Sequence, residues 1–245
     1  MNLKNQELKL YLQMQYDYLH YPYGAEALLR WEHPEKGFVS PGIFIPIAEE
    51  SELILDVSEW VLVEACSIIN RLNERDFSIS VNLSPRHFRK EDFVQHIKEI
   101  VRDTGADPRK LILEITEGLM IHDIKNVTEK MDELSGFGIR FSIDDFGTGY
   151  SSLTYIKRLP ISEIKIDRSF IQGIPADEND TAIVNAIIAI GNNMNLKIVA
   201  EGVETREQVN FLKSRDPGIL YQGFLFSRPG PWQEVMDKIQ GHEGP

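Results

Sequence analysis

Polar side chains that could do chemistry recur at the ends of short apolar segments along the chain. Glu114 lies within Leu-Ile-Leu-Glu-Ile-Thr, and Ile143 is followed directly by two aspartates. A single polar residue there would mark only the point where a strand reaches solvent, because Asp and Asn are common in turns. Glu is not a typical turn residue, however, and the feature recurs in seven segments. Its residues are Glu26, Asn82, Glu114, Glu117, Asp144, Asp145, Lys165, Asp167, Glu201 and Gln222.

These residue types indicate a metal site. Five or more clustered carboxylates would repel one another strongly without cations. Carboxylates and an Asn amide supply hard oxygen ligands, which suit Mg²⁺ or Mn²⁺. Zinc is disfavoured, because the six histidines show neither His-Glu-x-x-His nor a paired spacing and the chain has a single cysteine. The adjacent Asp144 and Asp145 could bridge two ions, the usual arrangement for cleaving phosphodiesters.

Other catalytic patterns have little support. Gly-x-Ser-x-Gly is absent, and Ser151 and Ser152 have no neighbouring histidine. The stretch Gly147-Thr148-Gly149-Tyr150 begins neither a dinucleotide-binding fingerprint nor a phosphate-binding loop. It is interpreted either as a flexible strand-to-helix turn or as a mobile loop coupled to metal occupancy.

Alternating strands and helices must position these residues. Short β-branched runs alternate with amphipathic segments from about residue 75 onward. The expected strands are Lys9–Gln15, Gly24–Arg30, Phe77–Val81, Leu111–Ile115, Arg140–Ile143, Glu163–Ile166, Lys197–Ala200 and Ile219–Phe226. The expected helices are Val57–Leu72, Glu91–Asp103, Ile124–Ser135, Thr181–Met194 and Arg206–Ser214, with a shorter one after Ser151. Asp56 and Glu59 occupy N-cap and capping-box positions for the first of these helices.

The pattern predicts an α/β fold. The first two strands are too close in sequence for a helical crossover, so we expect them to be antiparallel. Alternation of strands and helices fits either a closed barrel or an open doubly wound sheet. Eight strands in 245 residues favour a TIM-like (β/α)8 barrel with an antiparallel first strand. In such a barrel the polar strand ends meet at one face, where barrel enzymes place their active sites.

Composition excludes several classes of protein. The formal net charge of −12 argues against binding to polymeric nucleic acid, which requires a basic surface. No apolar run has the roughly 18 residues that a membrane helix needs, and the first residues lack the apolar core of a secretion signal. The single cysteine, Cys66, has no partner for an internal disulfide and lies on an apolar helix face, where packing is its expected role. We therefore expect a cytoplasmic globular protein.

The motifs together resemble the EAL domains, the cyclic di-GMP phosphodiesterases. Glu26-Ala27-Leu28 matches the name-giving tripeptide. In family order follow Asn82-Leu83-Ser84, Glu114-Ile115-Thr116-Glu117, Asp144-Asp145-Phe146-Gly147-Thr148-Gly149-Tyr150-Ser151-Ser152, Lys165-Ile166-Asp167, Ala200-Glu201-Gly202-Val203-Glu204 and Gln222-Gly223. The resemblance extends from about Leu10 to Pro229. It departs at Gln13-Met14, where the family often has Gln-Pro, and before Gln222, where the family often has Gly-Cys-Asp.

The resemblance implies a role for each matching residue. The metal ligands would be Glu26, Asn82, Glu114 and Asp144 for one ion and Asp145 for the other. The catalytic set would be Lys165, Glu201 and Glu117. Lys165 would contact the attacking water, either as a base with a depressed pKa or as a cation that holds the water. Glu117 would anchor the loop that follows Asp144. The substrate-binding set would be Gln13, Arg30, Asp167 and Gln222, and Glu204 would support the site from behind its ligands.

The implied function is hydrolysis of cyclic di-GMP to linear pGpG by in-line attack of water activated by two Mg²⁺ or Mn²⁺ ions. One alternative is a non-catalytic cyclic di-GMP receptor, and another is proton abstraction next to a carboxylate on a metal-binding barrel. We expect a single domain over residues 1–245, and the family also suggests that it is excised from a larger multidomain signalling protein. The implied partners are cyclic di-GMP, a second copy forming a homodimer, and a regulatory or diguanylate-cyclase domain.

Overall fold

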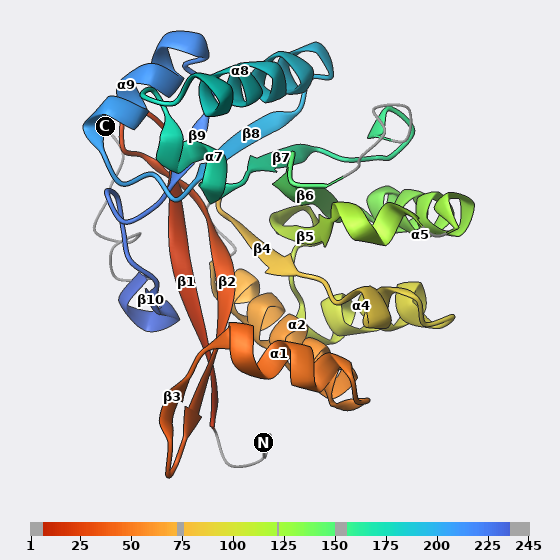
Figure 1. The fold of residues 1–245 in the computed structure, drawn as a ribbon. Coiled ribbons are helices and arrows are strands. Elements are labelled where there is room, and N and C mark those ends of the chain that lie inside the picture. The colour runs from red at the N-terminus through yellow and green to blue at the C-terminus, as the bar shows by residue number, and fades with distance from the viewer. Residues whose placement is uncertain (1–6, 73–75, 122, 150–155, 236–245) are drawn as a thin grey trace.

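The computed structural model describes residues 7–72, 76–121, 123–149 and 156–235 and contains a closed barrel of eight strands (Figure 1). Around the barrel the strands follow the order β1-β2-β4-β5-β6-β7-β8-β9, and β9 pairs again with β1. Their bounds are β1 Leu8–Tyr16, β2 Pro22–His33, β4 Ser78–Asn82, β5 Leu111–Thr116, β6 Arg140–Phe146, β7 Glu163–Ile166, β8 Lys197–Glu201 and β9 Leu220–Gln222. The predicted TIM-like (β/α)8 barrel is confirmed.

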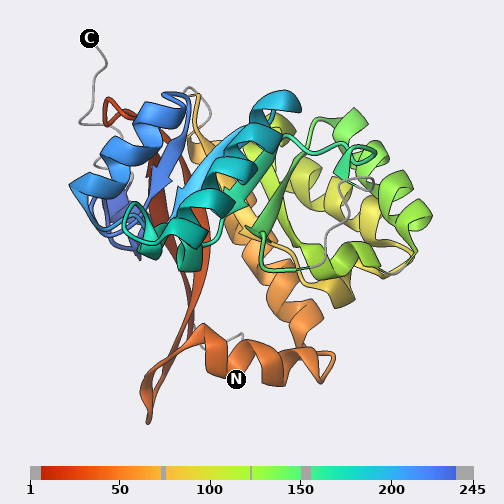
Figure 2. The same ribbon diagram turned by 45° about the horizontal axis from the view of Figure 1, so that its top comes forward.

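The first strand runs antiparallel to both of its barrel neighbours, as expected. It pairs with β2 along its whole length, from Leu8 opposite Trp31 to Tyr16 opposite Pro22. It meets β9 through Tyr16 opposite Tyr221, and this pair closes the barrel. All other neighbouring barrel strands are parallel, and helices lie around the outside of the barrel (Figures 1 and 2).

The parallel strands are buried on both faces, but the two faces differ in chemistry. On β5, Leu113 and Ile115 are fully buried and point away from the lumen, toward the helices. Alternation of side chains places Glu114 between them on the opposite face, inside the barrel. Lys165 on β7 occupies the corresponding position between Ile164 and Ile166, which are also fully buried. The apolar core is therefore the layer between strands and helices, whereas the lumen carries polar side chains.

Helices follow the strands with the capping residues that their sequences provide. Helix α9 begins with a complete capping box between Thr205 and Gln208. Helices α4 and α5 end at Gly105 and Gly138, whose positive φ angles of 70° and 112° favour glycine. The longer helices are α2 Leu53–Arg71, α4 Phe93–Thr104, α5 Ile124–Phe137, α8 Glu178–Asn193 and α9 Arg206–Arg215, and the shorter ones are α1 Pro41–Glu49, α3 Pro85–Phe88, α7 Arg168–Gly173, η2 Pro108–Lys110 and η3 Glu117–Ile121.

Several element ends differ from the expected ones, and the two largest differences are at α2 and β9. Helix α2 begins at Leu53 rather than Val57, so Asp56 lies inside its first turn, and its N-cap, Glu52, makes no capping hydrogen bond through its side chain. Strand β9 ends at Gln222 rather than Phe226, because the chain turns there and the Ser227 amide bonds to the Gly223 carbonyl. The helix expected after Ser151 begins outside the described residues, whereas Cys66 is fully buried on α2 as predicted.

A β-hairpin and one helix project beyond the barrel on one side (Figures 1 and 2). The outer half of β2 pairs with β3 (Gly37–Val39), and α1 follows directly. A two-residue strand, β10 (Gly230–Pro231), pairs with β1 near Leu12. The sequence analysis predicted none of β3, α1 and β10. None of the described helices combines the length and the apolar composition that crossing a bilayer requires.

Candidate active site

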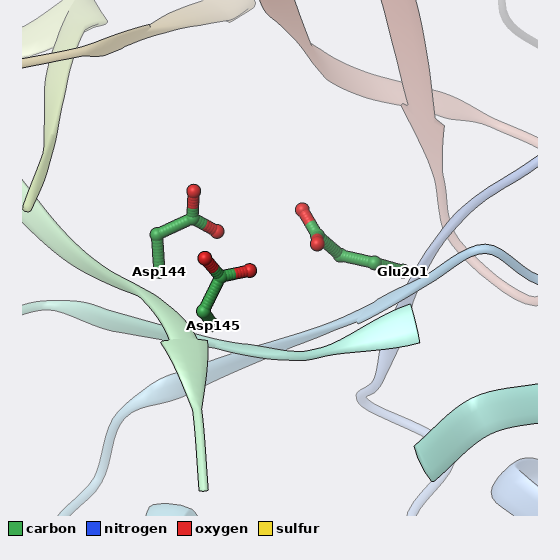
Figure 3. Close-up of side chains that lie close together, drawn as sticks. All are labelled: Asp144, Asp145 and Glu201. Atoms are coloured by element: carbon green, nitrogen blue, oxygen red, sulfur yellow. The ribbon is translucent and has the colours of Figure 1, made fainter. Parts of the chain in front are cut away.

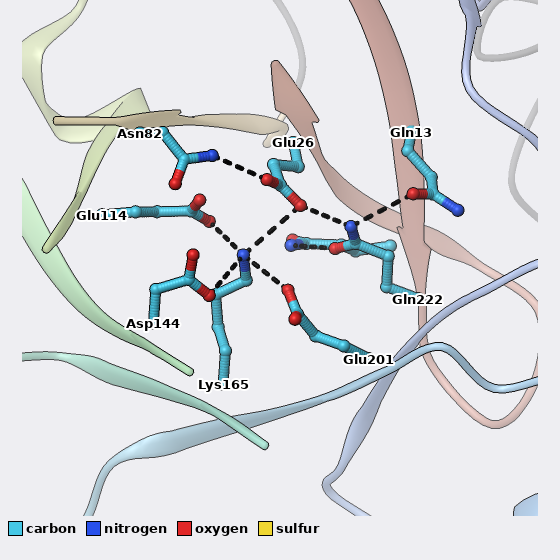
Figure 4. A network of polar contacts seen from close by, with 9 residues as sticks. Gln13, Glu26, Asn82, Glu114, Asp144, Lys165, Glu201 and Gln222 are labelled. Atoms are coloured by element: carbon cyan, nitrogen blue, oxygen red, sulfur yellow. Dashed lines mark hydrogen bonds and ion pairs between the residues drawn. The ribbon is translucent and has the colours of Figure 1, made fainter. Parts of the chain in front are cut away.

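The centre of the site is a buried lysine surrounded by carboxylates (Figure 4). Lys165 extends from β7 into the lumen, and its side chain is 0% exposed. Its Nζ lies 2.6 Å from Glu201, 2.9 Å from Glu114, 3.1 Å from Asp144 and 3.3 Å from Glu26. Four strands each contribute one carboxylate, so the structure brings together residues that span most of the sequence.

Strand register explains why these side chains meet. Asn82 lies opposite Glu114 between β4 and β5, and Thr116 lies opposite Asp144 between β5 and β6. Glu201 lies opposite Gln222 between β8 and β9. All are close to the carboxyl ends of parallel strands, which face the same end of a barrel.

Hydrogen bonds from amide side chains fix the orientation of Glu26. Its Oε1 accepts a hydrogen bond of 2.8 Å from Asn82, and its Oε2 accepts one of 2.5 Å from Gln222. Gln222 in turn accepts a hydrogen bond of 3.0 Å from Gln15 and donates one of 3.4 Å to Gln13 (Figure 4). The side chains of this network come from β1, β2, β4 and β9.

The electrostatics of the cluster depend on Lys165. Burial opposes the charged lysine, but the charges of Glu114, Glu201, Glu26 and Asp144 raise the pKa of Lys165 well above its usual value. These surroundings favour the cationic form of Lys165. The other form that the sequence analysis left open, a base with a depressed pKa, would require bound cations beside the lysine. Burial raises the pKa of Glu114 well above its usual value and that of Glu201 to about 8, although Lys165 opposes both changes.

A second group of carboxylates lies at the mouth of the barrel. Asp144, Asp145 and Glu201 each offer one oxygen, and these oxygens all lie within 4.8 Å of one another (Figure 3). Burial and the charges of Asp144 and Asp167 raise the pKa of Asp145 to about 6. Asp145 has φ of 52°, a left-handed conformation that is rare outside glycine and concentrates at functional sites.

The donor set fits divalent cations. Glu26, Glu114, Asp144, Asp145 and Glu201 carry five carboxylates against the one ammonium of Lys165, which leaves excess negative charge. Both Glu114 oxygens and Asp144 Oδ1 are buried without a hydrogen bond of good geometry. Hard oxygen donors in excess of the available protein cations are the ligands that Mg²⁺ and Mn²⁺ prefer.

Two cavities adjoin the cluster. One of about 300 Å³ is lined by Gln13, Glu26, Leu28, Arg30, Asp144, Arg168, Glu201, Gly202, Glu204, Gln222, Gly223, Phe224 and Pro229. The other, of about 710 Å³, lies over Asn82 and Asp145 and has mostly apolar walls from β2, α1 and α2. Arg30 and Leu28 line both cavities. The site therefore offers cationic and apolar surface beside the carboxylates.

Glu117 lies beside the loop after β6, which it is predicted to anchor. It begins η3, is 8% exposed, and its Oε1 accepts a hydrogen bond of 2.9 Å from the Gly147 amide. A Cβ at Gly149 would come within 2.4 Å of its Oε2, so the loop passes directly over this carboxylate. The predicted contact between Glu117 and the loop after β6 is present as far as Gly149, and residues 150–155 lie outside the described residues.

The surroundings of some residues differ from those that the sequence predicted. Asp167 caps α7 by accepting a hydrogen bond of 3.0 Å from the Ser169 amide, and it does not line either cavity. Glu204 lines the smaller cavity itself and accepts a hydrogen bond of 3.0 Å from Arg168. The sequence analysis did not single out Gln15 and Arg168. Arg168 could have been identified from the sequence, because it directly follows the motif Lys165-Ile166-Asp167. Nothing in the sequence distinguished Gln15 from an ordinary strand residue.

Comparisons with known proteins agree with this geometry. The family model described as "EAL domain" matches residues 1–229. The bifunctional diguanylate cyclase/cyclic di-GMP phosphodiesterase MucR of Pseudomonas aeruginosa is 46% identical over 219 residues, which are 88% of this chain and 32% of MucR. The cyclic di-GMP phosphodiesterase NbdA of the same organism is 40% identical over 220 residues, 89% of this chain and 28% of NbdA. This chain thus spans about a third of the length of these relatives.

A solved structure described as "PaMucR Phosphodiesterase, c-di-GMP complex" superposes with a TM-score of 0.91 at 44% identity, over 95% of this chain and 96% of that one. The EAL enzyme Bd1971 in its cAMP-bound form gives a TM-score of 0.90 at 33% identity, over 96% of this chain and 67% of that one. With the same fold as these enzymes and a family match across almost its whole length, the chain belongs to the EAL domain family.

Proposed function

We propose that the chain is a phosphodiesterase that hydrolyses cyclic di-GMP to linear pGpG with the help of two Mg²⁺ or Mn²⁺ ions. The observation that carries this proposal is the convergence of five carboxylates and Asn82 on one end of the barrel, directly beside a cavity lined by arginines. Relatives named as cyclic di-GMP phosphodiesterases support the choice of substrate.

The residues divide into two sets of ligands. Glu26, Asn82, Glu114 and Asp144 would hold one cation in the lumen, and Asp145, with Asp144 and Glu201 beside it, would hold the other at the mouth. When bound, such cations supply neutralising charge and lower the pKa of water so that hydroxide is available near neutral pH.

The remaining residues bind and orient the substrate. Arg30 and Arg168 line the smaller cavity, where their guanidinium groups would neutralise the phosphates. Gln13 and Gln222 would hold the substrate against β1 and β9. Lys165 would keep its proton at Nζ and hold the attacking water as a hydrogen-bond donor. Water adds to phosphorus in line with the bond to the 3′ oxygen, and that bond breaks to leave a 3′ hydroxyl and a 5′ phosphate.

The two cavities suit an elongated dinucleotide. Leu28 and Arg30 line both of them, so a ligand with two bases could occupy both beside the carboxylate cluster. We further infer that residues 1–245 form a single EAL domain of a longer signalling protein, since the relatives extend well beyond the matched region. A homodimer and an attached regulatory or diguanylate-cyclase domain remain proposals of the same kind.

Product analysis tests the proposed function. The purified chain is incubated with cyclic di-GMP and Mn²⁺, and products are separated by chromatography and identified by mass spectrometry. We expect pGpG as the first product. Tight binding of cyclic di-GMP with no product would favour the non-catalytic receptor, and neither binding nor product would contradict the proposed ligand.

A further inference from the structure

Gln15 is a buried polar side chain of the barrel lumen that has no role in the proposed reaction. It is 1% exposed, and it lies on the same face of β1 as Gln13, because side chains two residues apart on a strand point the same way. Gly24 on β2 lies directly opposite Gln15. A Cβ on Gly24 would lie 3.3 Å from Gln15 Oε1 and 2.8 Å from the Ser78 carbonyl oxygen, so the glycine leaves room for the glutamine side chain.

Three glutamine side chains form a continuous chain of hydrogen bonds that ends on Glu26. Gln13 donates from Nε2 to the backbone carbonyl of Ser227 over 3.2 Å. Gln222 donates from Nε2 to Gln13 Oε1 over 3.4 Å and to Glu26 Oε2 over 2.5 Å (Figure 4). Gln15 donates from Nε2 to Gln222 Oε1 over 3.0 Å. Both ends of the Gln222 amide therefore have partners.

The direction of these hydrogen bonds is fixed by groups that can only accept. A backbone carbonyl and a carboxylate have no proton to donate, so Gln13 must turn its Nε2 toward Ser227 and Gln222 must turn its Nε2 toward Glu26. The Gln222 oxygen then faces Gln15, which has to donate. Rotation of the Gln222 amide by half a turn would place its oxygen against two acceptors, Glu26 Oε2 and Gln13 Oε1. The position of Gln15 thus requires a hydrogen-bond donor.

Glu26 is held at both of its carboxylate oxygens. Asn82 donates to Oε1 over 2.8 Å, and Gln222 donates to Oε2. Lys165 also lies 3.3 Å from Oε2, but its ammonium group is shared among four carboxylates. Hydrogen bonds of this kind fix the plane of a carboxylate, and the orientation of a ligand affects how tightly it binds a metal. Loss of the bond from Gln222 would leave Glu26 freer to turn.

We propose that Gln15 is a positioning residue for Glu26 and that it acts through Gln222. The donor of Gln15 satisfies the Gln222 oxygen and so keeps the Gln222 Nε2 group on Glu26. Without that donor, a buried amide oxygen loses its partner, and Gln222 is no longer held in the orientation that Glu26 requires. The inference rests on the proposed function, which assigns Glu26 to the metal. Removal of groups that orient metal ligands commonly weakens metal binding by roughly 10- to 100-fold.

Exchange of side-chain amide protons tests the positioning role without metal or substrate. The Nε2 protons of Gln222 are assigned by NMR in the metal-free chain, and their exchange with solvent is measured in the wild type, Gln15→Met and Gln15→Leu. Both variants remove the donor and keep an apolar side chain of similar size. We expect exchange at least about tenfold faster in both variants. Gln95→Met, at an exposed glutamine on α4, should leave it unchanged. Equal exchange in all four proteins would overturn the proposal.

Titration with Mn²⁺ tests the consequence for the metal site. Calorimetry is performed on the metal-stripped chain without substrate, and we expect Gln15→Met to bind its first Mn²⁺ at least about tenfold more weakly than the wild type. Because weaker binding is overcome by concentration, the Mn²⁺ concentration for half-maximal turnover should rise by a similar factor, and saturating Mn²⁺ should restore the wild-type kcat. Wild-type Mn²⁺ affinity in Gln15→Met would contradict the effect on Glu26.

A double-mutant cycle tests whether Gln15 acts through Gln222. Gln222→Met removes the donor to Glu26 itself, so the further change Gln15→Met should weaken Mn²⁺ binding by less than about twofold in that background. Two losses that multiply would show that Gln15 acts independently of Gln222 and would overturn the proposal. A wild-type chain that binds no Mn²⁺ would contradict the proposed function, while the amide exchange would still decide whether Gln15 positions Gln222.

Discussion

Lys165 brings a buried positive charge into a group of carboxylates that would otherwise repel one another. The sequence predicted Lys165 near the metal ligands, and the structure brings its Nζ within 3.3 Å of three of the predicted ligands, Glu26, Glu114 and Asp144, and of Glu201. The sequence could not reveal this, because the contact depends on strand register around a closed barrel. The contributing strand ends were identifiable from polar residues that interrupt apolar runs.

Asp145 offers a clean test of the metal assignment, because it is exposed and its loss should leave the fold intact. We expect Asp145→Ala to lower kcat for cyclic di-GMP by about a thousandfold, as removal of a group that stabilises transition-state charge can do. Asp132→Ala, which removes an exposed carboxylate from α5, serves as the matched control. Turnover by Asp145→Ala at the wild-type rate would rule out its role as a ligand.

His87 predicts how stability depends on pH. Burial lowers the pKa of His87 to about 4, and its ring packs edge-on against Phe93 with centroids 5.2 Å apart. The unfolded chain, with a histidine pKa of about 6.5, binds more protons than the fold between these values, so stability falls as pH falls from about 6.5 toward 4.

For this group we expect a loss of about 2 kcal/mol in the free energy of unfolding between pH 7 and pH 5. The measurement is urea unfolding in EDTA at both pH values. His87→Phe keeps a ring and removes the titration, so its loss should be smaller by that amount. The same pH dependence in both proteins would show that His87 does not contribute.

At the scale of elements, the loop after β6 is tied to η3 by a single described side chain. Glu117→Ala removes the acceptor for the Gly147 amide, whereas Glu117→Gln keeps an oxygen at the same place. We expect the alanine variant to lower kcat by about 10- to 100-fold, because Asp144 and Asp145 lie at the end of β6 directly before this loop and small misplacements at a site are costly. Hydrogen exchange at residues 144–149 should rise in the alanine variant and much less in the glutamine variant. Unaltered kcat and exchange after Glu117→Ala would contradict the anchoring role.

The turn after β9 depends on the close approach of the backbones of Gly223 and Val203. A Cβ at Gly223 would lie 2.1 Å from the carbonyl oxygen of Val203 and 2.3 Å from its nitrogen, so no side chain fits there. We expect Gly223→Ala to lower the free energy of unfolding by about 1–3 kcal/mol. Gly136→Ala, in a helix with open space around the glycine, should instead raise it by about 0.5–1 kcal/mol. Urea unfolding checks both, and no loss in Gly223→Ala would mean that the turn relaxes freely.

The parallel barrel strands were predictable because buried strands read as short apolar runs separated by amphipathic helices. The secondary structure of the segment from Gly37 to Glu49 was not predictable from the sequence. Its apolar run Ile43–Ile47 fits either a strand or a helix, and Pro46 obscures the helical pattern. The end of β9 was misjudged for a different reason. The run Ile219–Phe226 is apolar or aromatic except for Gln222 and Gly223, but the packing of Gly223 against Val203 stops the strand at Gln222.

At the scale of the whole molecule, closure of the barrel makes the site. Residues from β1 to β9 reach one lumen only because the antiparallel first strand pairs with both β2 and β9. The order of motifs in the sequence was sufficient to expect this barrel, whereas the two cavities depend on loops and on the position of α1. The cytoplasmic location inferred from composition stays a prediction.

Because carboxylates outnumber cationic side chains at this lumen, we expect turnover to require bound metal. The most direct measurement is the turnover of cyclic di-GMP by the chain after EDTA treatment, followed by titration with Mg²⁺ or Mn²⁺. We expect no turnover in EDTA and recovery that saturates with added metal in the wild type. Full turnover in EDTA, unchanged by added metal, would contradict it.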